Sequence, residues 1–248
     1  MAQIRVFADE LTDQLDSPTL VEGLPGVGLV GKIAADHLVE VFDMTHYGDV
    51  YCGGVPKVAV YMEGSPTLHP PVRLYADAEH DLLVLQSDIP IRPESATELA
   101  TCLDSWIADL DVTPIYLSGI ARQKSDGVPA LYGVGSDGVL DRLEEAGIGL
   151  PTETGLISGP TGAMLNYSVQ RGTPAFGLIV ESDPQFPDPE AARIIIKQGI
   201  EPLTGIEVPV DDLVDSAAEI RQAKENLAKQ MQQADEESSQ ARPLGMYQ

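Results

Sequence analysis

The sequence predicts an α/β protein with a mostly parallel central sheet covered by helices. Two observations favour this class. Strand-like apolar runs alternate with helical patterns along residues 1–210, and a glycine-rich turn joins one of these runs to a helix. A chain of 248 residues is also long enough to bury a substantial core without disulfides or metals. We therefore expect one α/β domain over residues 1–210.

The expected strands are short runs with the composition of β-structure: Ile4–Phe7, Thr19–Gly23, Met44–Tyr51, Val58–Met62, Val72–Tyr75, Leu82–Gln86, Thr113–Leu117 and Ala175–Glu181. Helical periodicity follows Gly28, where Val30, Ala34 and Leu38 share one face. Further helices are expected over Ser95–Leu110, Leu140–Ala146, Gly162–Gln170 and Pro189–Ile200. The consecutive strands between residues 47 and 86 predict an antiparallel insertion in the sheet.

The end of the chain has a different character. Residues 211–235 predict one long amphipathic helix, whose narrow apolar stripe could pack on the domain or on a neighbouring subunit. The polar residues that follow, with Pro243 and Gly245, predict a flexible tail over 236–248. This tail ends in Met246-Tyr247-Gln248. A flexible tail leaves a tyrosine and a terminal carboxylate either solvated or presented to another protein.

The charge balance excludes two classes of partner. The chain has 39 acidic and 15 basic residues, and its formal net charge is −24. Such a surface repels phosphates, so we expect neither nucleic acid nor an anionic membrane as a partner. The acids are scattered and lysine is scarce, which is typical of a halophilic protein in concentrated salt; one acidic face for a basic partner is the alternative.

Cysteine content and hydropathy predict a soluble cytoplasmic protein. The two cysteines, Cys52 and Cys102, are too few for a disulfide framework and favour a reducing compartment. No apolar run approaches the length of a membrane span, and residues 1–7 lack the layout of a signal peptide.

Residues 23–32 contain two glycine patterns that resemble nucleotide-binding loops. One is G-x-G-x-x-G, and the other is G-x-x-x-x-G-K ending at Lys32. However, Ile33 stands where a magnesium-binding hydroxyl is required, and Asp49 is the only acid near the end of the next strand. The pattern favours a structural turn, with Lys32 in a solvated position and close helix–sheet packing at its key residues: Gly23, Pro25, Gly26, Gly28 and Gly31.

No catalytic, cofactor or metal site is predicted. The segment 134–138 lacks the first glycine of a nucleophile elbow, so Ser136 or Asp137 is expected to cap a helix. The histidines show no metal-ligand spacing with one another or with the cysteines: His37, His46, His69 and His80.

Three segments together resemble the proteasome assembly chaperone 2 family. They are Leu20–Gly31, Gly155–Leu165, and Glu181–Asp183 followed by Pro187–Ala192. The resemblance covers roughly residues 3–235. It implies a nucleoside-phosphorylase-like α/β fold, homo-oligomers and, in archaeal members, binding to proteasome α-subunits or the core particle.

The resemblance gives the tail a role. Met246, Tyr247 and Gln248 match the motif by which such members dock on the proteasome α-ring. We therefore expect a non-enzymatic assembly chaperone or core-particle-binding and activating factor. A nucleotide- or nucleoside-using enzyme built on the glycine turn is one alternative, and an oligomeric scaffold with another protein partner is a second.

Overall fold

The computed structural model describes residues 4–121, 128–136, 138–213 and 215. An eight-stranded sheet forms its centre, with a separate two-stranded sheet beside it. The strands in chain order are β1 (Ile4–Val6), β2 (Thr19–Gly23), β3 (Thr45–Val50), β4 (Val60–Tyr61), β5 (Leu68–His69), β6 (Val72–Asp77), β7 (Leu82–Ser87), β8 (Thr113–Ala121), β9 (Leu131–Gly135) and β10 (Phe176–Ser182).

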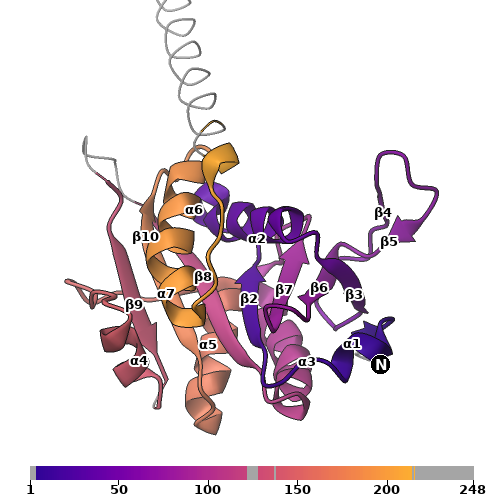
Figure 1. Cartoon of the computed structure of the whole chain (residues 1–248), viewed down its shortest axis with the longest axis horizontal. Coiled ribbons are helices and arrows are strands. Elements are labelled where there is room, and N and C mark those ends of the chain that lie inside the picture. Colours follow the sequence, from indigo (N-terminus) through magenta and orange to yellow (C-terminus); the bar gives the residue numbers. More distant parts are fainter. Residues whose placement is uncertain (1–3, 122–127, 137, 214, 216–248) are drawn as a thin grey trace, which may run out of the picture.

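The strand order in the large sheet is β1-β3-β6-β7-β2-β8-β10-β9. The four strands β7, β2, β8 and β10 run parallel to one another. Strands β1, β3 and β6 add an antiparallel half next to β7, and β9 adds an antiparallel edge to β10. The predicted parallel sheet with an antiparallel insertion is therefore confirmed. The hairpin β4–β5 extends away from this insertion (Figure 1).

Helices cover both faces of the sheet (Figure 1). The longer ones are α2 (Val30–Val41), α3 (Ala96–Asp109), α5 (Gly159–Arg171) and α6 (Pro189–Ile195), and the shorter ones are α1 (Asp9–Thr12), α4 (Leu140–Glu145) and α7 (Glu201–Thr204). A turn of π-helix, Ile196–Ile200, connects α6 to α7, and 3₁₀ turns span Val27–Leu29 and Pro93–Ser95.

Two apolar cores lie between these layers. On one face, α2 and α6 pack on the parallel strands through buried residues that include Val30, Leu38 and Ile195. On the other face, α3 and α5 cover the sheet through residues such as Leu99 and Met164. The parallel strands are therefore buried on both sides, as expected of a doubly covered sheet.

Strand β9 was not among the predicted strands. Its sequence, LYGVG, contains two glycines, which weaken the strand pattern. The structure gives these glycines a packing role. A Cβ on Gly133 would press on Leu143 and Ile148, and a Cβ on Gly135 would overlap Val139. The absence of side chains at both positions lets α4 and its flanking residues pack directly on the strand.

The predicted C-terminal helix and tail lie largely outside the described residues. Residues 211–213 are helical, and Leu213 is buried against the core that contains α2 and α6. This contact fits a helix that starts on the domain. Within the described part of the chain, no helix is long and apolar enough to cross a membrane.

Candidate functional site

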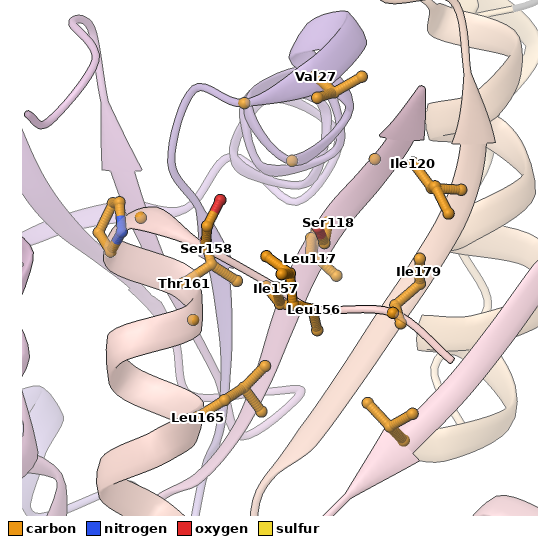
Figure 2. Close-up of a pocket in the computed structure, with 18 of the residues that line it drawn as sticks. Val27, Leu117, Ser118, Ile120, Leu156, Ile157, Ser158, Thr161, Leu165 and Ile179 are labelled. Atoms are coloured by element: carbon orange, nitrogen blue, oxygen red, sulfur yellow. The ribbon is translucent and has the colours of Figure 1, made fainter. Parts of the chain in front are cut away.

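A cavity of about 850 Å³ lies at the carboxyl ends of β2 and β8 (Figure 2). Its walls are the glycine turn at residues 24–27, the end of β8 at 117–121, part of β9, the loop at 151–158 and the first turns of α5. Open α/β sheets commonly take ligands at this position, outside the carboxyl ends of parallel strands.

The cavity wall is mainly apolar. Figure 2 shows Val27, Ile120, Leu156, Ile157 and Ile179 around the space, with hydroxyl groups at its edges. Leu156 is 86% exposed, so the loop that carries it offers apolar surface to solvent. None of the described lining residues is a lysine, arginine or histidine. The described wall therefore favours an apolar ligand or peptide over a phosphate.

A buried carboxyl group ties three walls of this cavity together. Glu22, at the end of β2, is fully buried. One of its oxygens accepts a hydrogen bond from the backbone N–H of Leu24 at 3.2 Å, and the other accepts from the N–H of Leu117 at 3.2 Å. The hydroxyl of Thr161, on α5, donates to the same carboxyl at 3.1 Å. Glu22 thus joins the glycine turn, β8 and α5.

Burial raises the pKa of Glu22 to about 7 from an ordinary value of 4.5. The hydrogen bonds from Leu117, Thr161 and Leu24 act in the opposite direction, because they stabilise the carboxylate. Sequence reasoning missed this residue. The available signal was an acid in the apolar run Leu20–Gly23, at a position where a doubly covered parallel strand is normally apolar.

Gly23 and Gly28 have the close packing that the sequence predicts, whereas Gly26 does not, because a Cβ there would meet no heavy atom within 4 Å. Gly28 has φ of +61°, and a Cβ there would overlap the hydroxyl oxygen of Ser182. Its carbonyl accepts a hydrogen bond from the N–H of Asp188 at 2.8 Å. Gly23 lies against Ala35 so closely that a Cβ would overlap that side chain. The turn therefore holds α2 on the sheet and fixes the segment that follows β10.

The other residues of the glycine turn lie beside the cavity. Leu24, Pro25, Gly26 and Gly31 are part of its wall, whereas Lys32 is not. Lys32 is half-buried, so it is less solvated than the sequence predicts. Its ammonium group pairs with the carboxylate of Asp36 at 2.8 Å, and its side chain is only 22% exposed. The pairing reflects their i, i+4 spacing on one side of α2.

Ser136 does not cap a helix. Helix α4 begins after Val139 without a side-chain cap. The Ser136 hydroxyl instead donates to the carbonyl of Thr173 at 2.6 Å and accepts from the N–H of Ala175 at 2.9 Å. It satisfies backbone groups at the start of β10, which explains a buried serine at this point. Asp137 lies outside the described residues.

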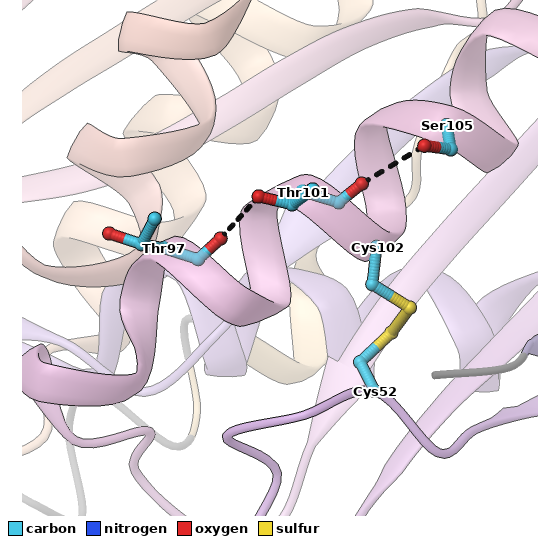
Figure 3. The surroundings of a disulfide bond; sticks show 5 residues. All are labelled: Cys52, Thr97, Thr101, Cys102 and Ser105. Carbon is cyan, nitrogen blue, oxygen red and sulfur yellow. Dashed lines mark hydrogen bonds between the residues drawn. A yellow bond between two sulfur atoms is a disulfide. The ribbon is translucent and has the colours of Figure 1, made fainter. Parts of the chain in front are cut away.

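The two cysteines form a disulfide, contrary to the expectation of reduced thiols (Figure 3). Cys52 follows β3, Cys102 lies on α3, and their Cα atoms are 5.8 Å apart. On the same helix, the hydroxyl of Thr101 donates a hydrogen bond to the Thr97 carbonyl at 2.8 Å, and the hydroxyl of Ser105 donates to the Thr101 carbonyl at 3.1 Å. A separation of 50 residues gave no local signal for this pairing.

The spacing of the histidines in the sequence also gave no sign of a group of possible metal ligands that the structure brings together. Donor atoms of His46, Asp49 and His69 all lie within 4.8 Å of one another in the structure. His69 is far from the other two residues in sequence and reaches them through the β4–β5 hairpin. The predicted partner-binding residues Met246, Tyr247 and Gln248 lie outside the described residues.

The three segments that carry the family resemblance contact one another in the structure. Thr161, from the second segment, bonds Glu22 in the first. Gly28, from the first, contacts Ser182 and Asp188 in the third. Sequence comparison agrees: a family model described as the PAC2 family matches residues 20–228.

Similar proteins cover nearly the whole chain. An uncharacterized protein of Methanocaldococcus jannaschii is 25% identical over 225 residues, which are 90% of this chain and 91% of that one. Among solved structures, Pyrococcus furiosus PbaA, titled an archaeal homolog of proteasome-assembly chaperone, is 26% identical with a TM-score of 0.79 and covers 96% of this chain and 95% of its own. P. furiosus PbaB, titled an archaeal proteasome activator, has a TM-score of 0.76 at 22% identity, covers 92% of this chain and 98% of its own, and shares the fold.

Proposed function

Because the chain belongs to the PAC2 family, we propose that it acts without turnover as a proteasome assembly chaperone or core-particle-binding factor. The observation that carries the proposal is the similarity to PbaA, which extends over 96% of this chain at 26% identity. That similarity supports a proteasome-related role. The finer assignment, docking through the tail, rests on the sequence of the last three residues.

We assign the docking contacts to three groups. Met246 enters an apolar groove between α-subunits, the ring of Tyr247 packs on the pocket wall, and the carboxylate of Gln248 pairs with a lysine. Residues 236–248 reach roughly 40 Å if extended and about 20 Å on average if flexible. We further propose that the protein forms a cytoplasmic homo-oligomer, so that several weak tails act together through their effective concentration.

The test is capture of proteasome core particles from the same organism by co-sedimentation in molar KCl. Deletion of Met246–Gln248, and the substitution Tyr247→Ala, should each abolish capture. Gln248→Ala is the matched control, because it keeps the terminal carboxylate and the motif leaves this side chain free. Oligomeric state and circular dichroism should be unchanged in all variants. Undiminished capture by the truncated protein would contradict tail docking.

A second candidate function is favoured by the cavity, whose size and position suit a small ligand. Its described wall lacks a cation for a phosphate, so a nucleoside or an apolar metabolite fits better than a nucleotide. Calorimetry with ATP, NAD and nucleosides distinguishes the two functions. Two results together would favour the ligand-binding enzyme. The wild type would bind one of these ligands with micromolar affinity that Leu156→Asp abolishes, and the intact protein would capture no proteasome.

A further inference from the structure

A bulge in β3 places His46 and Asp49 on the same face of the sheet. Residues three apart in a regular strand point to opposite faces. Here the register with β6 shifts between His46 and Gly48, so His46 lies opposite Tyr75 and Asp49 lies opposite Arg73. Since those two partners are two residues apart, they share a face, and so do His46 and Asp49. The His46 Nε2 atom is 3.0 Å from a carboxylate oxygen of Asp49.

His69 brings a third donor to this pair. It is the last residue of β5, and its ring meets the ring of His46 edge to face with a centroid distance of 5.4 Å. One ring nitrogen of each histidine and one oxygen of Asp49 all lie within 4.8 Å of one another. Two strands that belong to different sheets therefore converge on one point through side chains that can bind a metal.

The neighbouring residues orient the Asp49 carboxylate and leave it able to bind a metal ion. Asp49 is only 6% exposed, and the hydroxyl of Tyr51 donates to its second oxygen at 3.0 Å. The opposing Arg73 is occupied elsewhere, because its five donors are taken up by Pro70, Tyr75, Gln86 and Asp88. The other cross-strand neighbour, Arg5, places its guanidinium over the ring of Phe7.

We propose that His46, Asp49 and His69 bind a divalent transition-metal ion of the Zn²⁺ type. Two imidazoles and one carboxylate are a donor set that such ions favour over magnesium or calcium. Tetrahedral bonds of about 2.0–2.1 Å separate ligand atoms by roughly 3.3 Å. The His46–Asp49 separation of 3.0 Å is already close to this value. Tyr51 is the outer partner that fixes the carboxylate, as metal-binding carboxylates usually require.

The bound ion would join the β4–β5 hairpin to the main sheet. His69 is on the hairpin, whereas His46 and Asp49 are on β3. The hairpin strands have only two residues each, and Tyr61 and Leu68 are 82% and 66% exposed. Such a hairpin buries little apolar surface of its own, so a metal bridge at its base is an effective constraint on its position. Three protein ligands leave a fourth position for water or a partner group.

The chain contains an internal comparison for an ordinary histidine–carboxylate pair. His80 and Asp77 have the same i, i+3 spacing as His46 and Asp49 and are 2.6 Å apart. Among the described residues, however, no further metal-binding side chain joins them. A pair without a third ligand should bind metal only weakly, so His80 provides a matched control.

The experiment is a Zn²⁺ titration of the full chain, stripped with a chelator and held in molar KCl, against a competing metallochromic dye. We expect one tight site per chain, lost in His46→Ala and in His69→Ala and retained in His80→Ala. Tyr51→Phe should weaken binding on the order of 10-fold, as loss of an outer hydrogen bond usually does. Circular dichroism checks that each variant is folded.

Two further readouts separate this site from loose binding by surface carboxylates. Co²⁺ in the wild-type site should give intense visible absorption typical of a four-coordinate ion, and His69→Ala should abolish it. Stoichiometric Zn²⁺ should also raise the melting temperature of the wild type and of His80→Ala, but not of His69→Ala. Weak multi-site binding that is equal in all variants, or an absence of Zn²⁺ binding, would overturn the proposal.

Discussion

At the scale of single residues, Glu22 links three walls of the cavity. Its two oxygens accept from backbone groups on the glycine turn and on β8, while Thr161 approaches from α5. Loss of the carboxyl would leave two buried N–H groups without their partner, which costs free energy whatever the charge state. Its burial also favours the protonated form of its carboxyl group in the folded protein.

The raised pKa of Glu22 predicts that the stability of the protein depends on pH. The pKa of Glu22 is about 7 in the folded protein against an ordinary value of 4.5. Between these values the unfolded chain loses the proton and the folded chain retains it, so the free energy of unfolding falls as pH rises. The contribution is complete below pH 4.5 and lost by about pH 7, with a total of about 3 kcal/mol.

The measurement is the free energy of unfolding from pH 4.5 to 8 at fixed KCl, for wild type and Glu22→Gln. The Gln variant lacks this titration. From pH 4.5 to 8, the free energy of unfolding of the wild type should therefore fall by about 3 kcal/mol relative to that of Glu22→Gln. Glu63→Gln, at an exposed position, should parallel the wild type. Parallel curves for wild type and Glu22→Gln would show that Glu22 titrates normally.

At the scale of elements, the sequence was most informative where the pattern is local. The unit from β2 through the glycine turn to α2 was predicted because its apolar run, its glycines and its helical face are contiguous. Strand β9 escaped prediction because its glycines serve the packing of α4.

The missed features depend on register or on distant segments. Only the β3 bulge puts His46 and Asp49 on one face, and only the hairpin brings His69 beside them. The disulfide likewise joins β3 to a helix 50 residues away. The cavity wall combines the glycine turn, β8, β9, the loop at 151–158 and α5, which are far apart in sequence, so no local pattern could predict the cavity.

The glycine turn predicts a sharp contrast between neighbouring substitutions. Gly28→Ala should lower the free energy of unfolding by more than about 2 kcal/mol, because a positive φ is unfavourable for alanine and its Cβ would overlap Ser182. Gly26→Ala should change it by less than about 0.5 kcal/mol, since Gly26 has an extended backbone and open space around its Cα. Chemical denaturation at fixed KCl measures both. Equal effects would contradict the packing role of Gly28.

At the scale of the whole molecule, the main feature is the large excess of negative charge. With 39 acidic and 15 basic residues, many carboxylates have no basic residue to pair with. Local pairs do form, such as Arg171 with Asp104 at 2.9 Å and Arg73 with Asp88 at 2.6 Å. The chain keeps a net charge of −24, and this excess of like charge repels itself in the compact folded state.

We therefore predict that salt stabilises this protein and its complexes. At 1 M salt the screening length falls to about 3 Å, which removes most of the repulsion between exposed carboxylates. Raising KCl from about 0.2 M to 2 M should increase the melting temperature and strengthen self-association. Proteasome capture should persist, because the contacts proposed for Met246 and Tyr247 are apolar and the contact proposed for the terminal carboxylate is short-range. The measurement is a salt series of thermal melts, sedimentation and core-particle capture. A steady loss of capture while the protein stays folded would instead indicate docking by long-range attraction between opposite charges. It would contradict both the predicted halophilic adaptation and the contacts proposed for the tail.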